Sequence, residues 1–240
     1  MNFNGIISLL IACIEFLLLF NLLVFVKKNR ANVIALIMIT LLASYQTMEF
    51  LMCQVELQSS FFPFLAFVII SLLPPLNLLL TINVKNEKVD KRIYLVFLPA
   101  IAFIIYYLFV IPQFAVTSCT VLYASYHYPL GDLFGFFYYL PILISIILLI
   151  VIIRNNQDKQ KKLIAKILLF GSIFISIPVI LGFTLMFFKN YSIISAVESI
   201  MCKFAFVYAI CLSFICLYNS PFNDERNYFK YLFGNKQRFG

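Results

Sequence analysis

Residues 134–174 read FGFFYYLPILISIILLIVIIRNNQDKQKKLIAKILLFGSIF, two long apolar runs on either side of a short basic segment. A helix of about 20 apolar residues is long enough to cross the hydrocarbon core of a bilayer. Basic residues between two spans favour the cytoplasmic surface. This stretch therefore predicts two antiparallel membrane helices that are joined on the cytoplasmic side.

The composition of the whole chain agrees with a membrane protein. Of its 240 residues, 63% are hydrophobic and 12% are charged, and the mean hydropathy is +1.00. Such a chain has too few polar residues to cover a water-exposed surface. We expect an all-α integral membrane protein with the lipid bilayer as its main partner.

Seven apolar stretches are long enough to span a membrane as helices, and no ten-residue alternation suggests a β-barrel. We expect residues 1–218 to form one seven-transmembrane helix bundle. Residues 219–240 alternate aromatic and basic side chains, which predicts an interfacial helix on the inner surface. The expected spans are residues 5–26, 32–53, 61–83, 93–112, 134–153, 163–187 and 194–217.

The basic residues predict the orientation of the bundle, because cytoplasmic loops are enriched in Lys and Arg. With the exception of Lys189, they follow alternate spans, so we expect the N-terminus outside and the C-terminus in the cytoplasm. The net charge of +8 then reflects topology, and a nucleic-acid partner is not expected. The residues are Lys27, Lys28, Arg30, Lys85, Lys88, Lys91, Arg92, Arg154, Lys159, Lys161, Lys162, Arg226, Lys230, Lys236 and Arg238.

Charged side chains within the spans are candidates for function, because lipid excludes charges that have no role. Counting residues along the helices places Glu15 and Lys203 near the midplane, and Glu49 and Glu198 nearer the outer surface. If spans 1, 2 and 7 are neighbours, Glu15 pairs with Lys203 and Glu49 with Glu198. The first pair is either a structural lock between helices or part of a ligand or proton site. In the second pair, the carboxyl groups of Glu49 and Glu198 would share a proton or bind a cation.

Prolines and cysteines give further candidates. Pro74 and Pro75 are expected to kink the third span, and Asn77, one turn later, would bond a freed carbonyl or line a cavity. Cys53 and Cys119 both fall on the outer side, where they would form a disulfide in an oxidising compartment. The outer segment 113–132, rich in Tyr, Ser and Thr, is either a lid or an interfacial anchor.

One family resemblance covers the middle of the chain. The residues VIISLLPPLNLLLTINVKNEKVDKRIYLVFLPAIAFII (68–105) carry a proline midway through the third span and another early in the fourth. After residue 134 come a Gln- and Lys-rich inner loop and a span with Gly171 and then Pro178. This pattern resembles the seven-span N-terminal sensor module of bacterial histidine kinases. The resemblance implies an outward-facing sensor or receptor in the cytoplasmic membrane of a prokaryote. Because no kinase module follows the last span, it implies output through a cytoplasmic signalling protein.

Other functions have less support. A small-solute or proton-coupled transporter is the main alternative, since IPQ (111–113) is similar to the Pro-Gln turn of small seven-span carriers, but no second copy occurs. A retinal protein would fit the span count and Lys203, but Ser199 replaces the expected acid, and tryptophan is absent. An intramembrane enzyme would depend on His127 with Cys119 and Asp132. No motif predicts a cofactor or a metal, and the small ligand of a receptor is not identified.

Overall fold

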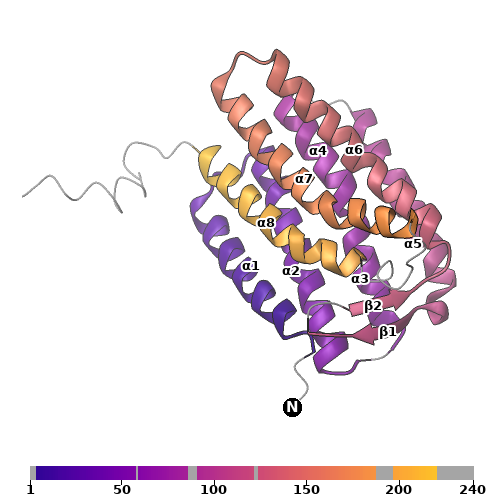
Figure 1. The fold of residues 1–240 in the computed structure, drawn as a ribbon. Helices are drawn as coiled ribbons and strands as arrows, with labels where there is room; N and C mark the ends of the chain where they lie inside the picture. Colours follow the sequence, from indigo (N-terminus) through magenta and orange to yellow (C-terminus); the bar gives the residue numbers. More distant parts are fainter. Residues whose placement is uncertain (1–3, 58, 86–90, 122–123, 188–196, 221–240) are drawn as a thin grey trace, which may run out of the picture.

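The computed structural model describes residues 4–57, 59–85, 91–121, 124–187 and 197–220, without the side chains of residues 91–92, 132, 182–187 and 197–199. The predicted interfacial helix of residues 221–240 and the side chain of Glu198 lie outside this part. The described residues form a bundle of helices with a small β-hairpin at one end (Figure 1).

Twelve elements follow one another along the described chain. They are α1 (Ile6–Phe25), α2 (Arg30–Gln54), α3 (Phe61–Ser71), α4 (Leu73–Lys85), the 3-10 helix η1 (Lys91–Phe97), α5 (Leu98–Phe109), the 3-10 helix η2 (Ile111–Gln113), β1 (Ala115–Cys119), β2 (Ala124–His127), α6 (Gly131–Asn155), α7 (Lys159–Phe187) and α8 (Val197–Tyr218).

Six helical stretches of the described chain are long and apolar enough to cross a membrane. They are α1, α2, the combined stretch of α3 and α4, α6, α7 and α8. This confirms the predicted helical, multi-pass character. The bounds also agree closely, since α1 covers Ile6–Phe25 and α2 covers Arg30–Gln54, where the sequence predicts spans 5–26 and 32–53.

The fourth predicted span is shorter than expected. Only residues Ile93–Phe109 form an apolar helical stretch there, and it falls among the shorter apolar helices. Its first part is the 3-10 helix η1, and the α-helix starts at Leu98 with Pro99 in its first turn. Proline lacks an N–H group and suits this position. A second proline, Pro112, follows the C-terminal end at Phe109.

The segment between α5 and α6 adds a short β-hairpin to the helical bundle. Strands β1 and β2 pair antiparallel there, with Val116 opposite Tyr126 and Cys119 opposite Ala124. The ladder is irregular between Val116 and Ser118, as in a β-bulge. Val, Thr and Tyr are favourable in strands, and residues of these types occur in both strands of the hairpin.

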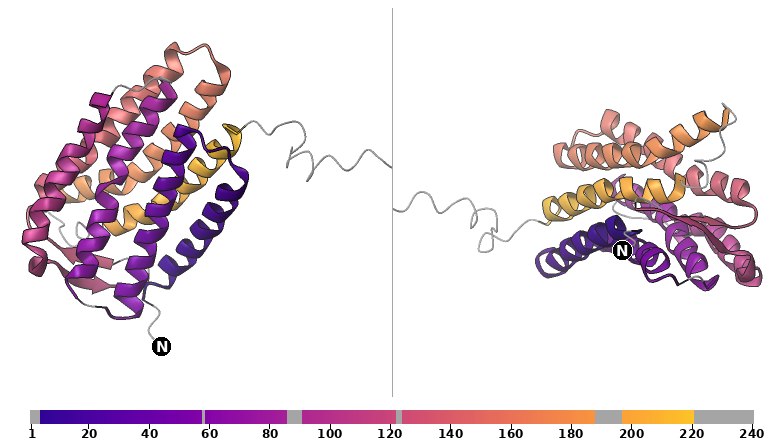
Figure 2. Two further views of the ribbon diagram at one scale, coloured as in Figure 1. Left: turned by 180° about the vertical axis from the view of Figure 1, so that it is seen from behind. Right: turned by 60° about the horizontal axis from the view of Figure 1, so that its bottom comes forward.

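Helix α8 lies between the α1–α2 pair and α7 (Figure 2). It packs against α1, α2 and α7, and α4 packs against α2, α6 and α7. The first two helices and the last are therefore mutual neighbours, as short antiparallel connections predict. This arrangement brings the charged residues of α1, α2 and α8 into one region.

The third predicted span is interrupted at Leu72, between α3 and α4. Pro74 and Pro75 follow directly, and neither can donate a backbone hydrogen bond to the preceding turn. Helix α4 restarts at Leu73, which puts both prolines in its first turn, where the missing N–H groups cost least. The break separates the half of the span near the hairpin from the half near Lys85.

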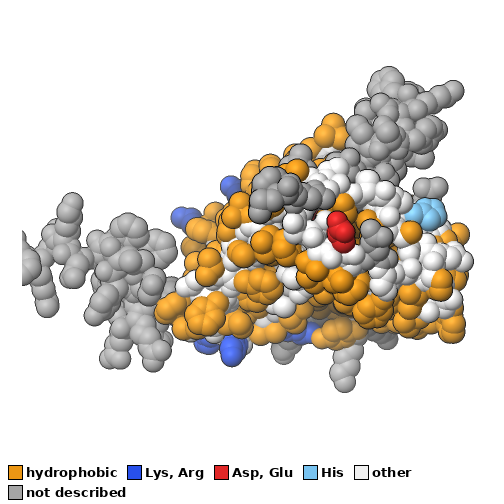
Figure 3. Space-filling model, turned by 90° about the horizontal axis from the view of Figure 1, so that it is seen from below, with side chains coloured by type: hydrophobic (Ala, Val, Ile, Leu, Met, Phe, Trp, Pro, Cys, Tyr) orange, Lys and Arg blue, Asp and Glu red, His pale blue; other side chains and the backbone are white. Residues whose placement is uncertain are grey.

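The two ends of the bundle differ. The hairpin end carries β1, β2 and the N-terminal ends of α1 and α8. Its surface mixes hydrophobic side chains with uncharged polar and backbone atoms, an acidic side chain and a histidine, and Lys and Arg appear only at the margins (Figure 3). The basic end carries the α1–α2 turn, the α6–α7 connection and the C-terminal end of α8. Residues Lys27, Lys28, Arg30, Arg154 and Lys159 lie in or beside these connections.

Candidate functional site

Lys203 of α8 is the centre of a polar network at the hairpin end. Its Nζ atom donates to Ser8 Oγ at 2.7 Å, to Gln46 Oε1 at 2.7 Å and to Glu49 Oε2 at 2.8 Å. An ammonium group has three N–H donors, so every donor of Lys203 has an acceptor. The acceptors come from α1 and α2, so the network joins three helices.

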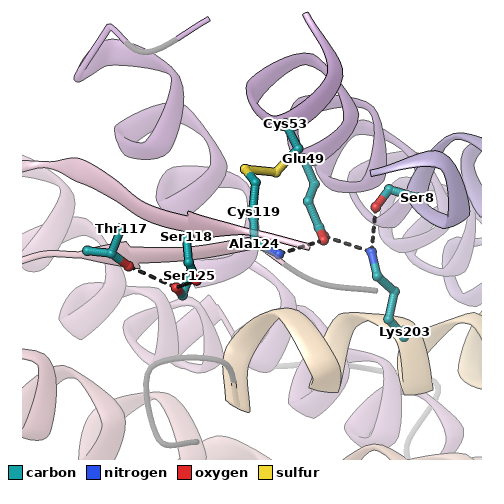
Figure 4. Close-up of a disulfide and its surroundings, with 9 residues drawn as sticks. All are labelled: Ser8, Glu49, Cys53, Thr117, Ser118, Cys119, Ala124, Ser125 and Lys203. Atoms are coloured by element: carbon teal, nitrogen blue, oxygen red, sulfur yellow. Dashed lines mark hydrogen bonds and ion pairs between the residues drawn. A yellow bond between two sulfur atoms is a disulfide. The ribbon is translucent and has the colours of Figure 1, made fainter. Parts of the chain in front are cut away.

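Glu49 of α2 connects this network to the hairpin. Its side chain is completely buried, whereas that of Lys203 is 13% exposed. One carboxylate oxygen, Oε2, forms the ion pair with Lys203, and the other, Oε1, accepts a hydrogen bond from the backbone N–H of Ala124 at 3.0 Å. Figure 4 shows Glu49 between the start of β2 and Lys203. A single buried carboxylate thus holds α2, α8 and β2 together.

The predicted ion pair between Glu15 and Lys203 is wrong, because Lys203 pairs with Glu49. Side chains on a helix lean towards its N-terminus. Helix α8 starts at the hairpin end, so the long Lys203 stem brings its ammonium group towards that end. Helix α2 runs in the opposite direction, so Glu49 leans inward and meets it. Ser8, which also accepts from Lys203, precedes Glu15 by about 10 Å along α1.

Glu15 lies deeper in the same interface. Its side chain is fully buried, and neither carboxylate oxygen has a hydrogen-bond partner within the described part of the chain. Glu15 is therefore a second carboxyl group near Lys203, without direct contact.

The predicted pair of Glu49 and Glu198 is not tested, because the Glu198 side chain lies outside the described residues. Glu49 is already bonded to Lys203 and to the hairpin. Whether a cation or a shared proton joins the two carboxyl groups stays a prediction.

The hairpin is also attached covalently. Cys53, near the end of α2, forms a disulfide with Cys119 of β1 (Figure 4). Next to it, the backbone N–H of Gly5 donates to Thr120 O at 3.0 Å. Gly5 has φ of 75°, and an added Cβ would lie 3.1 Å from Cys53 Cβ, so glycine suits this position in both conformation and space. The hairpin is thus fixed to α1 and α2 as well as to α8.

The disulfide also removes the basis of the enzyme hypothesis. A nucleophilic set of Cys119, His127 and Asp132 requires a free thiol, and the Cys119 sulfur is bonded to Cys53. His127 ends β2 with an exposed side chain, and the Asp132 side chain lies outside the described residues.

Aromatic side chains pack between the hairpin segment and the helices. The Tyr45 and Tyr126 hydroxyl groups lie 3.0 Å apart, within hydrogen-bond distance. The Phe67 ring packs against those of Tyr107, Phe114 and Tyr128 at centroid distances of 4.6, 5.8 and 5.3 Å. Offset and edge-to-face ring pairs of this kind add stability beyond buried area. These contacts pack the hairpin closely against the helices of the bundle.

The remaining predicted residues lie at the break between α3 and α4. Pro74 and Asn77 line a cavity of about 30 Å³ together with Tyr208 of α8. Pro75 lines a smaller cavity of about 10 Å³, where Pro99 and Pro141 also lie. The Tyr208 hydroxyl donates to Asn77 Oδ1, so Asn77 links α4 to α8.

Sequence reasoning missed two members of the Lys203 network, Ser8 and Gln46. Gln46 stands three residues before Glu49, which places both on one face of α2. Gln46 Nε2 also donates to Cys202 O at 2.9 Å, so it contacts two consecutive residues of α8. The sequence signal that could have identified Gln46 is a polar residue three positions from a buried charged residue of the same helix.

The arrangement favours a structural connection over a reaction site, since every donor of Lys203 is used and Glu49 binds two partners. No protein-family model, curated protein or solved structure matches the chain.

Proposed function

We propose that the chain is a seven-span membrane receptor, with the hairpin end outside and the basic end in the cytoplasm. Two features of the chain support this orientation. Basic residues gather at one end, a disulfide lies at the other, and disulfides persist in oxidising compartments. The stretch Ile93–Phe109 would be the remaining span, since about 17 apolar residues is the lower limit for crossing a bilayer.

The observation that carries the receptor proposal is the position of Glu49. Its two oxygens contact Ala124 in the hairpin and Lys203 in α8. A displacement of the hairpin would therefore change the bonding of α8 directly. Helix α8 extends from this contact to the other end of the bundle, which makes it the element that can transmit the change.

At the basic end, the residues after α8 bond to the α1–α2 turn. Ser220 Oγ accepts from the Lys27 N–H at 3.0 Å and from Asn32 Nδ2 at 3.1 Å. Asn219 Nδ2 donates to Asn32 Oδ1 at 3.3 Å. A shift of α8 would alter these contacts, next to the basic residues of the inner surface. A cytoplasmic partner protein would bind this surface and respond to the change, as the resemblance to kinase sensor modules implies.

Transmission through α8 predicts a remote effect of Glu49→Gln. We expect faster amide hydrogen exchange not only in the hairpin but also in residues 27–32 and 215–220, with α6 unchanged. The physical reason is that loss of the Glu49 charge weakens the bond to Lys203 and releases α8. Hydrogen–deuterium exchange with mass spectrometry on the protein in lipid nanodiscs measures this.

The matched control is Val121→Ala, since Val121 lies next to β1 and is 42% exposed. It should leave residues 215–220 as in the unchanged protein. A response to Glu49→Gln that stays within the hairpin end would contradict the receptor proposal.

The orientation predicts which reagents reach the disulfide. In intact cells, an impermeant phosphine reductant followed by an impermeant maleimide should label Cys53 and Cys119, because the hairpin end would face outside. The variant with both cysteines changed to serine should lose that labelling. Labelling of these two positions only after cell lysis would reverse the proposed orientation.

A further inference from the structure

A group of polar side chains lies midway along the bundle, where α4, α7 and α8 meet. Asn77 and Thr81 stand four residues apart on α4 and therefore on one face. Both are buried, at 2% and 0% exposure, as is Tyr208 at 2%. The Tyr208 hydroxyl donates to Asn77 Oδ1. The amide oxygen of Asn77 is thus hydrogen-bonded, which leaves the question of what the amide nitrogen, Nδ2, donates to.

That donor group and a neighbouring hydroxyl have no protein partner. Asn77 Nδ2 and Thr81 Oγ1 make no hydrogen bond to any of the described residues. Buried polar groups are almost always hydrogen-bonded, and lipid cannot supply the bond. Of these two residues only Asn77 lines a cavity within the described part of the chain, so its amide group indicates an additional group at that place.

The space for such a group adjoins Asn77. The cavity of about 30 Å³ is lined by Asn77, Tyr208 and Pro74, and otherwise mainly by apolar side chains such as Met38, Met201 and Ala205. A buried water needs roughly 10–15 Å³ of such volume and at least two polar partners. The cavity has room for about two waters on that basis.

We infer that this cavity is an internal hydration site, in which Asn77 Nδ2 donates to a water and the Tyr208 hydroxyl oxygen accepts from it. The site lies beside Pro74, in the turn where α4 restarts after the break. A water bound there links Asn77 of α4 to Tyr208 of α8 through hydrogen bonds that can break and re-form. This inference holds independently of whether the chain is a receptor.

Hydroxyl-radical footprinting tests the inference, because radicals formed by X-rays from bound water oxidise the side chains beside it. The probe is water itself, and the sample is the full chain in lipid nanodiscs. We expect Tyr208 to be oxidised several-fold faster than Tyr107. Tyr107 is a suitable reference because it is the same residue type and is also buried, but it is surrounded by aromatic rings. Equal rates for the two residues would overturn the hydration site.

Two variants locate the water. Asn77→Leu removes the donor, and Ala205→Val fills the cavity without changing a polar group. Each should lower the Tyr208 oxidation rate to that of Tyr107. Should Asn77→Leu fail to fold, Ala205→Val gives the same test. An unchanged Tyr208 oxidation rate in a folded variant would overturn the inference.

Discussion

Lys203→Met is expected to lower the free energy of unfolding by about 3–5 kcal/mol, the usual cost of removing one partner from a buried ion pair. Methionine retains most of the side-chain volume, so the loss is mainly electrostatic. The change leaves the Glu49 carboxylate buried without its cation. It also removes the donor that Ser8 and Gln46 accept from. Unfolding in mixed dodecyl maltoside and SDS micelles, followed by circular dichroism, measures the loss.

Lys166→Met is the matched control, because Lys166 lies in α7 with an exposed side chain. An exposed substitution of this kind should change stability by less than about 0.5 kcal/mol. If both variants were equally stable, the network around Lys203 would contribute little to the fold.

Gly171→Ala is expected to destabilise the protein by about 1–3 kcal/mol, the usual cost of overpacking a core. A Cβ atom at this position of α7 would lie 2.3 Å from Cδ2 of Tyr208 and 2.9 Å from its Cε2. The ring cannot easily move aside, because it is buried and its hydroxyl group bonds to Asn77. The substitution should therefore separate α7 from α8.

Gly135→Ala is the control for this change. Gly135 also lies in a helix, α6, but an added Cβ there would meet no atom within 4 Å. Replacing a helical glycine by alanine without a clash should raise stability by about 0.5–1 kcal/mol. Thermal unfolding of the two variants compares them directly, and a Gly171→Ala variant as stable as Gly135→Ala would contradict the close packing of α7 on α8.

The helices of this bundle are predictable from local sequence. In lipid the backbone must form its own hydrogen bonds, so a long apolar run such as that of α1 has few alternatives to a helix. Proline chemistry is equally local, which is why the break at Leu72 follows from Pro74 and Pro75. The end of a run is less well defined, as the short α5 shows, because 3-10 and α-helix have similar hydropathy requirements.

The partner of Lys203 depends on non-local geometry. Depth along each helix places Lys203 near Glu15, but the direction of each side chain decides the contact. Lys203 and Glu49 lean towards each other because α8 and α2 run in opposite directions. The hairpin contact of Glu49 is equally non-local, since Ala124 lies 75 residues away in sequence.

The most direct test of the account is a double-mutant cycle that compares the two candidate partners of Lys203. We expect Lys203→Met and Glu49→Gln together to be more stable than the sum of the single losses predicts, with a coupling energy of about 1 kcal/mol or more. The parallel cycle with Glu15→Gln should give a smaller coupling, because the Glu15 carboxyl group makes no hydrogen bond to Lys203. Additive losses for Glu49, or a larger coupling for Glu15, would contradict the proposed connection between the hairpin and α8.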